Sequence, residues 1–179
     1  MMEIERKFRL NEEQAKRVAE YLEAQGVAPA VHQQADKIFL YKMDSFKNFT
    51  LGDPVMRLRS MDGKTLLTYK RAVNAAGDRV EHELGIDATE TMEKILQELG
   101  YMLAIRVEKR RVEYKLGDIA ACLDDVSGLG MFLELETICS SEDDIPKAQE
   151  KIMALAATMG LSAADIEVKK YDQLLDAKR

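Results

Sequence analysis

Apolar and polar residues alternate through much of this 179-residue chain with the two-residue period of a β-strand. In the first ten residues, Ile4, Phe8 and Leu10 fall on one face, and a run of charged residues falls on the other. The same alternation predicts seven further strands, of which two are joined as a hairpin at Asp62-Gly63. These strands cover residues 31–43, 55–61, 65–73, 79–86, 104–115, 119–126 and 131–139.

Apolar residues at helical spacing predict three helices and a short C-terminal piece. Asn11 is expected to be the N-cap of the first helix, with acidic residues in its first turn, and Gly26 is expected to end it. Gly100 is expected to end the second helix in the same way. The second and third helices cover residues 89–99 and 145–159, and the C-terminal piece carries Tyr171, Leu174 and Leu175.

Six of the predicted strands carry charges of both signs on their polar faces. On a single strand, such a face is most simply a solvated outer surface. The apolar stripes of the helices, however, need a surface to pack on, and only the apolar strand faces supply one. The sequence therefore predicts an α+β fold, an eight-stranded antiparallel closed barrel with the helices outside and the charged faces lining a tunnel. Apolar residues assigned to the outer face are Ile4, Phe8, Leu58, Leu67, Leu133 and Leu135.

The charged faces combine bases and acids in a pattern that suits a triphosphate and a divalent metal. Arginine and lysine side chains bind phosphate oxygens, and carboxylates ligate Mg²⁺ or Mn²⁺. Without an ion, carboxylates crowded together would have raised pKa values at a cost in stability. The expected triphosphate-binding residues are Lys7, Arg57, Arg59, Lys70, Arg79, Lys109 and Arg111. The expected metal ligands are Glu3, Glu5, Asp124, Glu134 and Glu136. The residues assigned to orient the bases are Glu81, Glu83 and Glu113.

Composition excludes several other kinds of function. The net charge of −6 argues against nucleic acid as a partner, and the absence of an 18-residue apolar run argues against a membrane. With only His32 and His82, a histidine zinc site or a Ser-His triad is not expected. Cys122 and Cys139 are interpreted as reduced structural thiols. These features predict a cytoplasmic protein with one domain over residues 1–179.

The order of the charged motifs resembles the CYTH superfamily, the triphosphate tunnel metalloenzymes. Glu3-x-Glu5-x-Lys7 opens the series, and the basic and acidic strand motifs follow in order over the whole chain. The chain length and the turn Gly128-Leu129-Gly130 look most like the class IV adenylyl cyclase branch. The resemblance implies an eight-stranded barrel that binds Mg²⁺ or Mn²⁺ and converts ATP to cyclic AMP and pyrophosphate.

Other functions stay open at this point. Relatives of the same fold hydrolyse thiamine triphosphate or inorganic triphosphate, and a non-catalytic nucleotide or polyphosphate sensor or a plain structural barrel are further alternatives. A homodimer is also left open. The chain departs from the family at Lys37, which stands where an acid usually precedes the Ile38-Phe39 pair, so no role is carried over to Asp36. In the C-terminal motif, Lys170 stands where serine is usual.

Overall fold

The computed structural model describes residues 2–25, 27–73 and 79–179. The chain folds as two compact units. Unit 1 comprises Met1–His32 and Arg110–Lys170, and unit 2 comprises Gln33–Lys109 and Tyr171–Arg179. Gly26 and the turn predicted at residues 74–77 lie outside the described residues.

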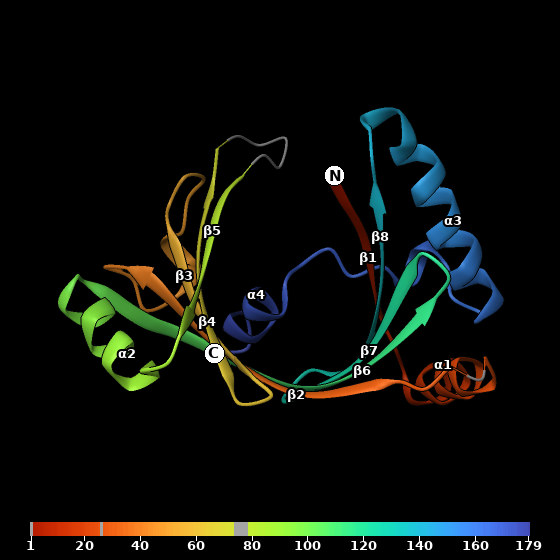
Figure 1. Ribbon diagram of the computed structural model, residues 1–179, viewed down its shortest axis with the longest axis horizontal. Helices are drawn as coiled ribbons and strands as arrows, with labels where there is room; N and C mark the ends of the chain where they lie inside the picture. Colours follow the sequence, from red (N-terminus) through yellow and green to blue (C-terminus); the bar gives the residue numbers. More distant parts are fainter. Residues whose placement is uncertain (1, 26, 74–78) are drawn as a thin grey trace. The chain divides into compact units, whose positions relative to one another are not determined.

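Every predicted strand and helix has a counterpart in the structure (Figure 1). The strands β3, β5 and β7 have the predicted bounds, whereas β6 begins at Tyr101 instead of Ala104. Strand β6 begins early because Gly100, in a left-handed backbone conformation (φ 90°), turns the chain directly out of α2. Tyr101, the first residue of β6, then packs edge-on against Tyr41 with ring centroids 5.5 Å apart. The strands are β1 Met2–Arg9, β2 Ala30–Tyr41, β3 Val55–Met61, β4 Lys64–Ala72, β5 Arg79–Ile86, β6 Tyr101–Leu116, β7 Ile119–Val126 and β8 Gly130–Cys139, and the helices are α1 Glu12–Ala24, α2 Thr89–Glu98, α3 Ile145–Thr158 and α4 Tyr171–Asp176.

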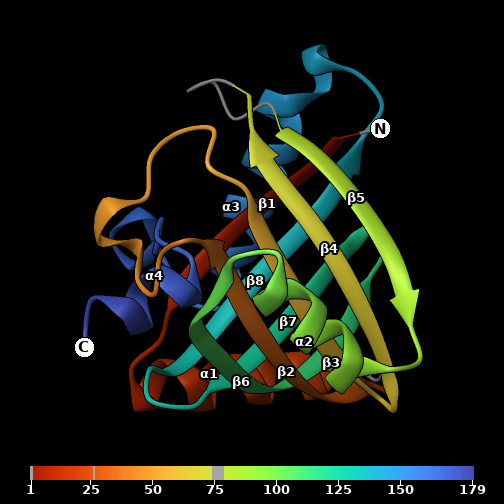
Figure 2. The ribbon, with the colours of Figure 1, turned by 90° about the vertical axis from the view of Figure 1, so that its left-hand side faces the viewer.

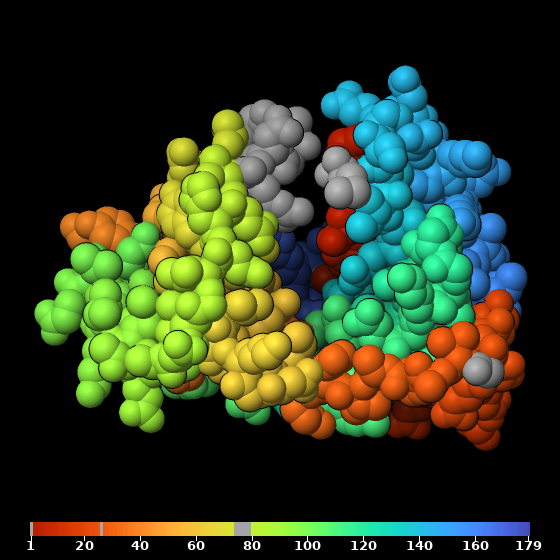
Figure 3. All heavy atoms as spheres, in the orientation of Figure 1, coloured from red at the N-terminus to blue at the C-terminus, as the bar shows by residue number. Residues whose placement is uncertain are grey.

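The eight strands form one hydrogen-bonded sheet in the order β1-β8-β7-β6-β2-β3-β4-β5. The pairs β1·β8, β7·β8, β2·β3, β3·β4 and β4·β5 are antiparallel, as predicted. The strands β1 and β5 are the ends of this order, so hydrogen bonds among the described residues do not close the sheet as the expected barrel would require. Strand β5 is largely exposed on the surface (Figure 3). It bears Glu81 and Glu83, and charged side chains of this kind protect an edge strand from pairing with another chain.

In unit 1, helices α1 and α3 cover the apolar face of the strands. Phe8, Leu133 and Leu135 are fully buried on that face. Leu22 of α1 and Ile152 of α3 belong to the same core, and α3 runs along β8 and β1 (Figure 1). Burial of each such side chain stabilises the fold by about 1.5–3 kcal/mol. The helices therefore pack where the alternation predicts, and the charged faces of these strands lie on the opposite side of the sheet.

In unit 2, helix α2 plays the same part. Leu96 of α2 packs with Phe39 of β2 and Leu58 of β3, and α2 lies over these strands in Figure 2. The hairpin between β3 and β4 turns at Asp62 and Gly63, which both have positive φ (51° and 76°), the conformation that a two-residue hairpin loop requires. None of the described helices is both long and apolar enough to cross a membrane.

Candidate active site

Two of the expected metal ligands face each other across neighbouring strands of unit 1. Glu5 of β1 is the direct cross-strand partner of Glu136 of β8, and Lys7 is the partner of Glu134. Opposite charges at such positions stabilise a sheet, whereas like charges destabilise it. The Glu5–Glu136 pair is therefore unfavourable unless a cation lies close to it.

The pKa values of both carboxyl groups are raised, first by burial and then by neighbouring acids. Partial burial, together with the nearby charge of Glu134, raises the pKa of Glu5 above its ordinary range, although Lys7 partly offsets the effect. Burial also raises the pKa of Glu136 to about 7; Arg111 lowers it, but the charges of Glu3, Glu134 and Glu5 raise it further. A divalent cation would favour the ionised forms of both groups. The pairing of β1 with β8 is therefore suited to bind a divalent cation.

Arg111 of β6 is the main counter-ion of the other acids in unit 1. Its Nε and Nη2 donate to the two carboxylate oxygens of Asp124, each at 2.7 Å. The same Nη2 also donates to Glu134, and Nη1 lies 3.7 Å from Glu136. Burial lowers the pKa of the guanidinium, but Asp124 and Glu134 together raise it well above its ordinary value. Since the Asp124 side chain is 0% exposed, Arg111 offsets a fully desolvated charge.

The oxygen ligands of unit 1 match what Mg²⁺ or Mn²⁺ prefers, but their present arrangement is held by Arg111. Within the described ranges, no three or more His, Cys, Asp or Glu side chains stand as a group that could hold an ion. Arg111 contacts three of the expected ligands and so supplies the positive charge that an ion would otherwise bring. Glu3 and Glu5 remain exposed, and they are the ligands most open to an incoming ion.

The raised pKa of Glu136 leads to a prediction for stability. In the unfolded chain a glutamate titrates near pH 4.3. The folded form keeps its proton up to about pH 7, so this group makes the metal-free protein less stable as pH rises between these values. Glu136→Gln should therefore raise the melting temperature measured in EDTA, with a gain of about 1–3 kcal/mol at pH 8 and a smaller gain at pH 5. An equal gain at both pH values would contradict the raised pKa.

In unit 2, Arg59 of β3 is held by an aspartate on the adjacent strand. Arg59 is the cross-strand partner of Asp36 of β2. Its Nε and Nη2 donate to Oδ1 and Oδ2 of Asp36, each at 2.8 Å. Gln34 donates a further hydrogen bond of 3.1 Å to Asp36. Asp36 is buried, and sequence reasoning gave it no role.

Arg57 has a weaker set of partners than Arg59. Its Nη2 donates to the hydroxyl of Thr68 at 3.2 Å and lies 4.0 Å from Glu83, and its buried Nε has no hydrogen-bond partner among the described residues. Burial and the neighbouring Arg59 lower the pKa of the guanidinium, an effect that Asp36 and others partly offset. A guanidinium whose charge is this poorly compensated is suited to bind an anionic ligand.

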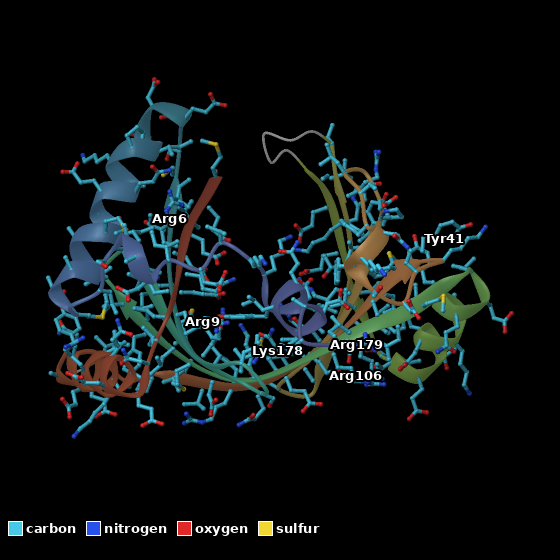
Figure 4. The ribbon with its side chains drawn as sticks, turned by 180° about the vertical axis from the view of Figure 1, so that it is seen from behind. Arg6, Arg9, Tyr41, Arg106, Lys178 and Arg179 are labelled. Atoms are coloured by element: carbon cyan, nitrogen blue, oxygen red, sulfur yellow. The ribbon has the colours of Figure 1, made fainter. Side chains whose placement is uncertain are left out.

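Two lysines complete the basic face of unit 2. Lys70 of β4 forms an ion pair of 2.9 Å with Glu81 of β5. Lys109 of β6 is buried, and its ammonium lies 5.1 Å from the centre of the Tyr171 ring, at the start of α4. The C-terminal end is anchored by Arg179, which donates to the carbonyl oxygen of Ala104 in β6 (Figure 4). The C-terminal piece predicted from sequence thus contacts one of the expected phosphate-binding bases.

The expected metal ligands and the expected bases are unevenly distributed between the two units. All five expected metal ligands belong to unit 1, with Lys7, Arg111 and Glu113. Unit 2 holds the remaining expected bases, with Glu81 and Glu83. The backbone of Arg79 pairs with Ala72, but its side chain lies outside the described part of the chain. The sequence did not identify Asp36, Thr68 and Tyr171 as partners of the bases. The one available signal was that Asp36 alternates with Gln34 and Ile38, and so lies on the same face of its strand as they do.

Comparison with known proteins shows the family of the chain. A model of the CYTH domain matches residues 1–171. The chain belongs to the CYTH family. A Methanocaldococcus jannaschii protein, whose name assigns it provisionally to the adenylate cyclases, is 31% identical over 97% of this chain and 98% of its own length. The adenylate cyclase CyaB of Aeromonas hydrophila is 30% identical over 55% of this chain and 51% of its own.

Several solved structures share the fold. A Pyrococcus horikoshii protein has 29% sequence identity and a TM-score of 0.76, with 97% of this chain and 99% of that chain covered. A Hippeastrum protein has 16% identity and a TM-score of 0.69, with 99% and 97% covered, and therefore shows the fold alone. That protein is known as an adenylyl cyclase candidate with a dominant triphosphatase activity. The predicted fold class, eight antiparallel strands with helices on their apolar faces, is confirmed.

Proposed function

We propose that this CYTH protein is a metal-dependent enzyme that converts ATP to cyclic AMP and pyrophosphate. The observation that carries the proposal is the direct pairing of Glu5 with Glu136, two carboxyl groups with raised pKa values, in a chain of this family. A structural sheet gains nothing from such a pair, whereas a site for a divalent cation needs it. The names of the relatives over most of the chain support a nucleotide triphosphate as the substrate.

The acids of unit 1 would hold the ion. Glu3, Glu5 and Glu136 are the ligands least committed to Arg111, and Glu134 and Asp124 would join them as the ion offsets their charge. When bound, Mg²⁺ or Mn²⁺ neutralises phosphate charge and favours deprotonation of the attacking hydroxyl group. Arg111 would keep its contact with Asp124, and its Nη1, which lies 3.7 Å from Glu136, would become available to a phosphate oxygen once Glu136 binds the ion.

The bases of unit 2 would bind the triphosphate. Arg57 offers a poorly compensated guanidinium, and Arg59 offers the edge that Asp36 leaves open. Lys70 and Lys109 add point charges, and Arg79 is expected to add a further one. In cyclisation the ribose 3′-hydroxyl attacks the α-phosphorus, and these cations stabilise the negative charge on the departing pyrophosphate.

Hydrolysis of thiamine triphosphate or inorganic triphosphate is the second candidate. Water would attack the terminal phosphorus, and both reactions need the same acids and bases. The Hippeastrum protein supports this alternative, because its description gives a dominant triphosphatase activity to an adenylyl cyclase candidate of this fold. A non-catalytic triphosphate-binding module would use the same residues without turnover.

A product assay separates these candidates. The protein is incubated with ATP, thiamine triphosphate or tripolyphosphate, with Mg²⁺ or Mn²⁺, and products are identified by mass spectrometry. Cyclic AMP and pyrophosphate in equal amounts are expected from ATP. Orthophosphate from tripolyphosphate without cyclic AMP would replace the cyclase with the phosphohydrolase, and binding without any product would leave only the binding module. An Arg57→Ala variant should lose most of whichever activity is found, since the triphosphate loses a charged hydrogen-bond donor.

A further inference from the structure

We infer that Asp36 is a positioning residue, which holds Arg59 so that the open edge of its guanidinium is presented to the triphosphate. The inference rests on the proposed function, since it concerns how the same site binds its substrate. It adds a residue that the charge pattern of the sequence left without a role.

The contact geometry shows how Asp36 would work. A guanidinium carries five N–H donors in a rigid fork. Asp36 accepts from Nε and Nη2 of Arg59 at 2.8 Å each, and so occupies one edge of the fork. The second N–H of Nη2 and one N–H of Nη1 form the outer edge, which matches the spacing of two phosphate oxygens. Asp36 therefore fixes the guanidinium plane without using the edge that a phosphate needs.

Asp36 is itself held in place. It stands directly across from Arg59 in the β2·β3 pairing. On the other face of the same two strands, Phe39 and Leu58 pack in the core of unit 2. Gln34, two residues earlier on the same face of β2, donates to Oδ2 of Asp36 at 3.1 Å. The Asp36 side chain is 8% exposed, whereas that of Arg59 is 25% exposed. The carboxylate is thus the fixed partner, and the arginine reaches from it toward solvent.

Two comparisons within the protein support the assignment. In unit 1, Arg111 makes the same contact, with Nε and Nη2 on the two oxygens of Asp124. Arg57, two residues before Arg59 on the same strand face, lacks such a partner and has only Thr68 within hydrogen-bond distance among the described residues. The bidentate aspartate is therefore a specific feature of Arg59 and Arg111, and proximity of acids and bases on one face does not by itself produce it.

Removal of the Asp36 carboxylate has two opposing effects on an anionic ligand. Loss of a negative charge near the ligand strengthens binding, and loss of the fixed orientation of Arg59 weakens it. A double-mutant cycle with Arg59 separates them, because a pure charge effect persists when Arg59 is absent, whereas a positioning effect disappears.

The experiment measures tripolyphosphate and ATP affinity in the presence of Mg²⁺ by calorimetry, for wild type, Asp36→Asn, Arg59→Ala and the double variant. We expect Asp36→Asn to weaken binding about tenfold to a hundredfold, the range for one charged hydrogen bond. In the Arg59→Ala background, Asp36→Asn should cause no further loss. Steady-state kinetics should show a raised KM with a smaller change in kcat, and Asp36→Glu should restore part of the affinity.

Glu98→Gln is the charge control in the same unit. Glu98 is an exposed residue at the end of α2, the helix that packs on the apolar face of β2 and β3. Its replacement removes one negative charge without freeing Arg59, so affinity should stay equal or increase slightly. Melting temperatures identify any variant that does not fold, and Asp36→Ala, which also removes the carboxylate, then takes the place of Asp36→Asn in the cycle.

Each outcome of the cycle has a definite consequence. Affinity of Asp36→Asn equal to or tighter than that of wild type would overturn the positioning role while leaving the proposed function intact. The same loss in the Arg59→Ala background would also overturn it, since Asp36 would then act independently of Arg59. If the wild type binds no triphosphate at all, the proposed function fails, and the role of Asp36 fails with it.

Discussion

Replacement of Arg111 by alanine is expected to lower the free energy of unfolding of the metal-free protein by about 3–5 kcal/mol, the cost of leaving a buried charge without its partner. Arg111 contacts Asp124, Glu134 and Glu136, of which Asp124 is 0% exposed. In a protein of this size the loss corresponds to a fall in melting temperature of roughly 6–20 °C. Thermal denaturation in EDTA at pH 8 provides the measurement.

Arg110→Ala is the matched control for this prediction. Arg110 is the preceding residue of β6, so its side chain lies on the other face of the sheet, where it is exposed. Its replacement should change the melting temperature little. The loss caused by Arg111→Ala should become smaller at pH 5, because the abandoned carboxyl groups then take up protons. Equal melting temperatures of the two variants would show that Arg111 is not the counter-ion of the acids.

Glu5→Gln is expected to reduce turnover at least about a hundredfold, equivalent to roughly 2.7 kcal/mol of transition-state stabilisation. Glu5 is exposed and faces Glu136, and the amide keeps its shape while removing the charge that a divalent ion requires. Chelation of wild type by EDTA should have the same effect, with recovery after Mg²⁺ or Mn²⁺ is added. Steady-state rates on the substrate identified by the product assay are compared at saturating metal.

Binding of Mn²⁺, followed by calorimetry, tests the ligand role of Glu5 apart from activity. The affinity should fall in Glu5→Gln and remain unchanged in Glu13→Gln, which removes an exposed carboxylate from α1. In EDTA, Glu13→Gln should melt close to wild type, and Glu5→Gln should melt at or slightly above wild type, because it removes one charge of the unfavourable Glu5–Glu136 pair. Full activity of Glu5→Gln, or of wild type in EDTA, would remove the metal from the mechanism.

The charged faces could be predicted from sequence because strand parity is a local property. Ile4 and Phe8 fall on the helix-covered face and Glu3 and Glu5 on the other, whatever the neighbouring strands are, since side chains alternate along any strand. The acids and bases of the site therefore gather on the predicted faces of their units. Alternation along a single strand does not predict which acid pairs with which base on a neighbouring strand.

Cross-strand register decided those partners. Asp36 meets Arg59, and Glu5 meets Glu136, only because β2·β3 and β1·β8 pair in one particular register. A shift by two residues would keep every side chain on its face and change every partner. The Asp36–Arg59 pair was missed for this reason, and so was the contact of Tyr171 with Lys109, which joins α4 to a strand far away in the sequence.

Sequence by itself determined the strands, the helices, the face on which each charge lies and the family. Tertiary structure alone decided that Arg111 compensates the acids of unit 1, that Asp36 holds Arg59, and that Arg57 is left with a buried Nε lacking a described partner. The physical reason is that alternation arises from the backbone of one strand, whereas hydrogen bonds and pKa shifts depend on distances of a few ångströms between strands. Those distances are set by pairing register and by burial, which no single segment of the chain contains.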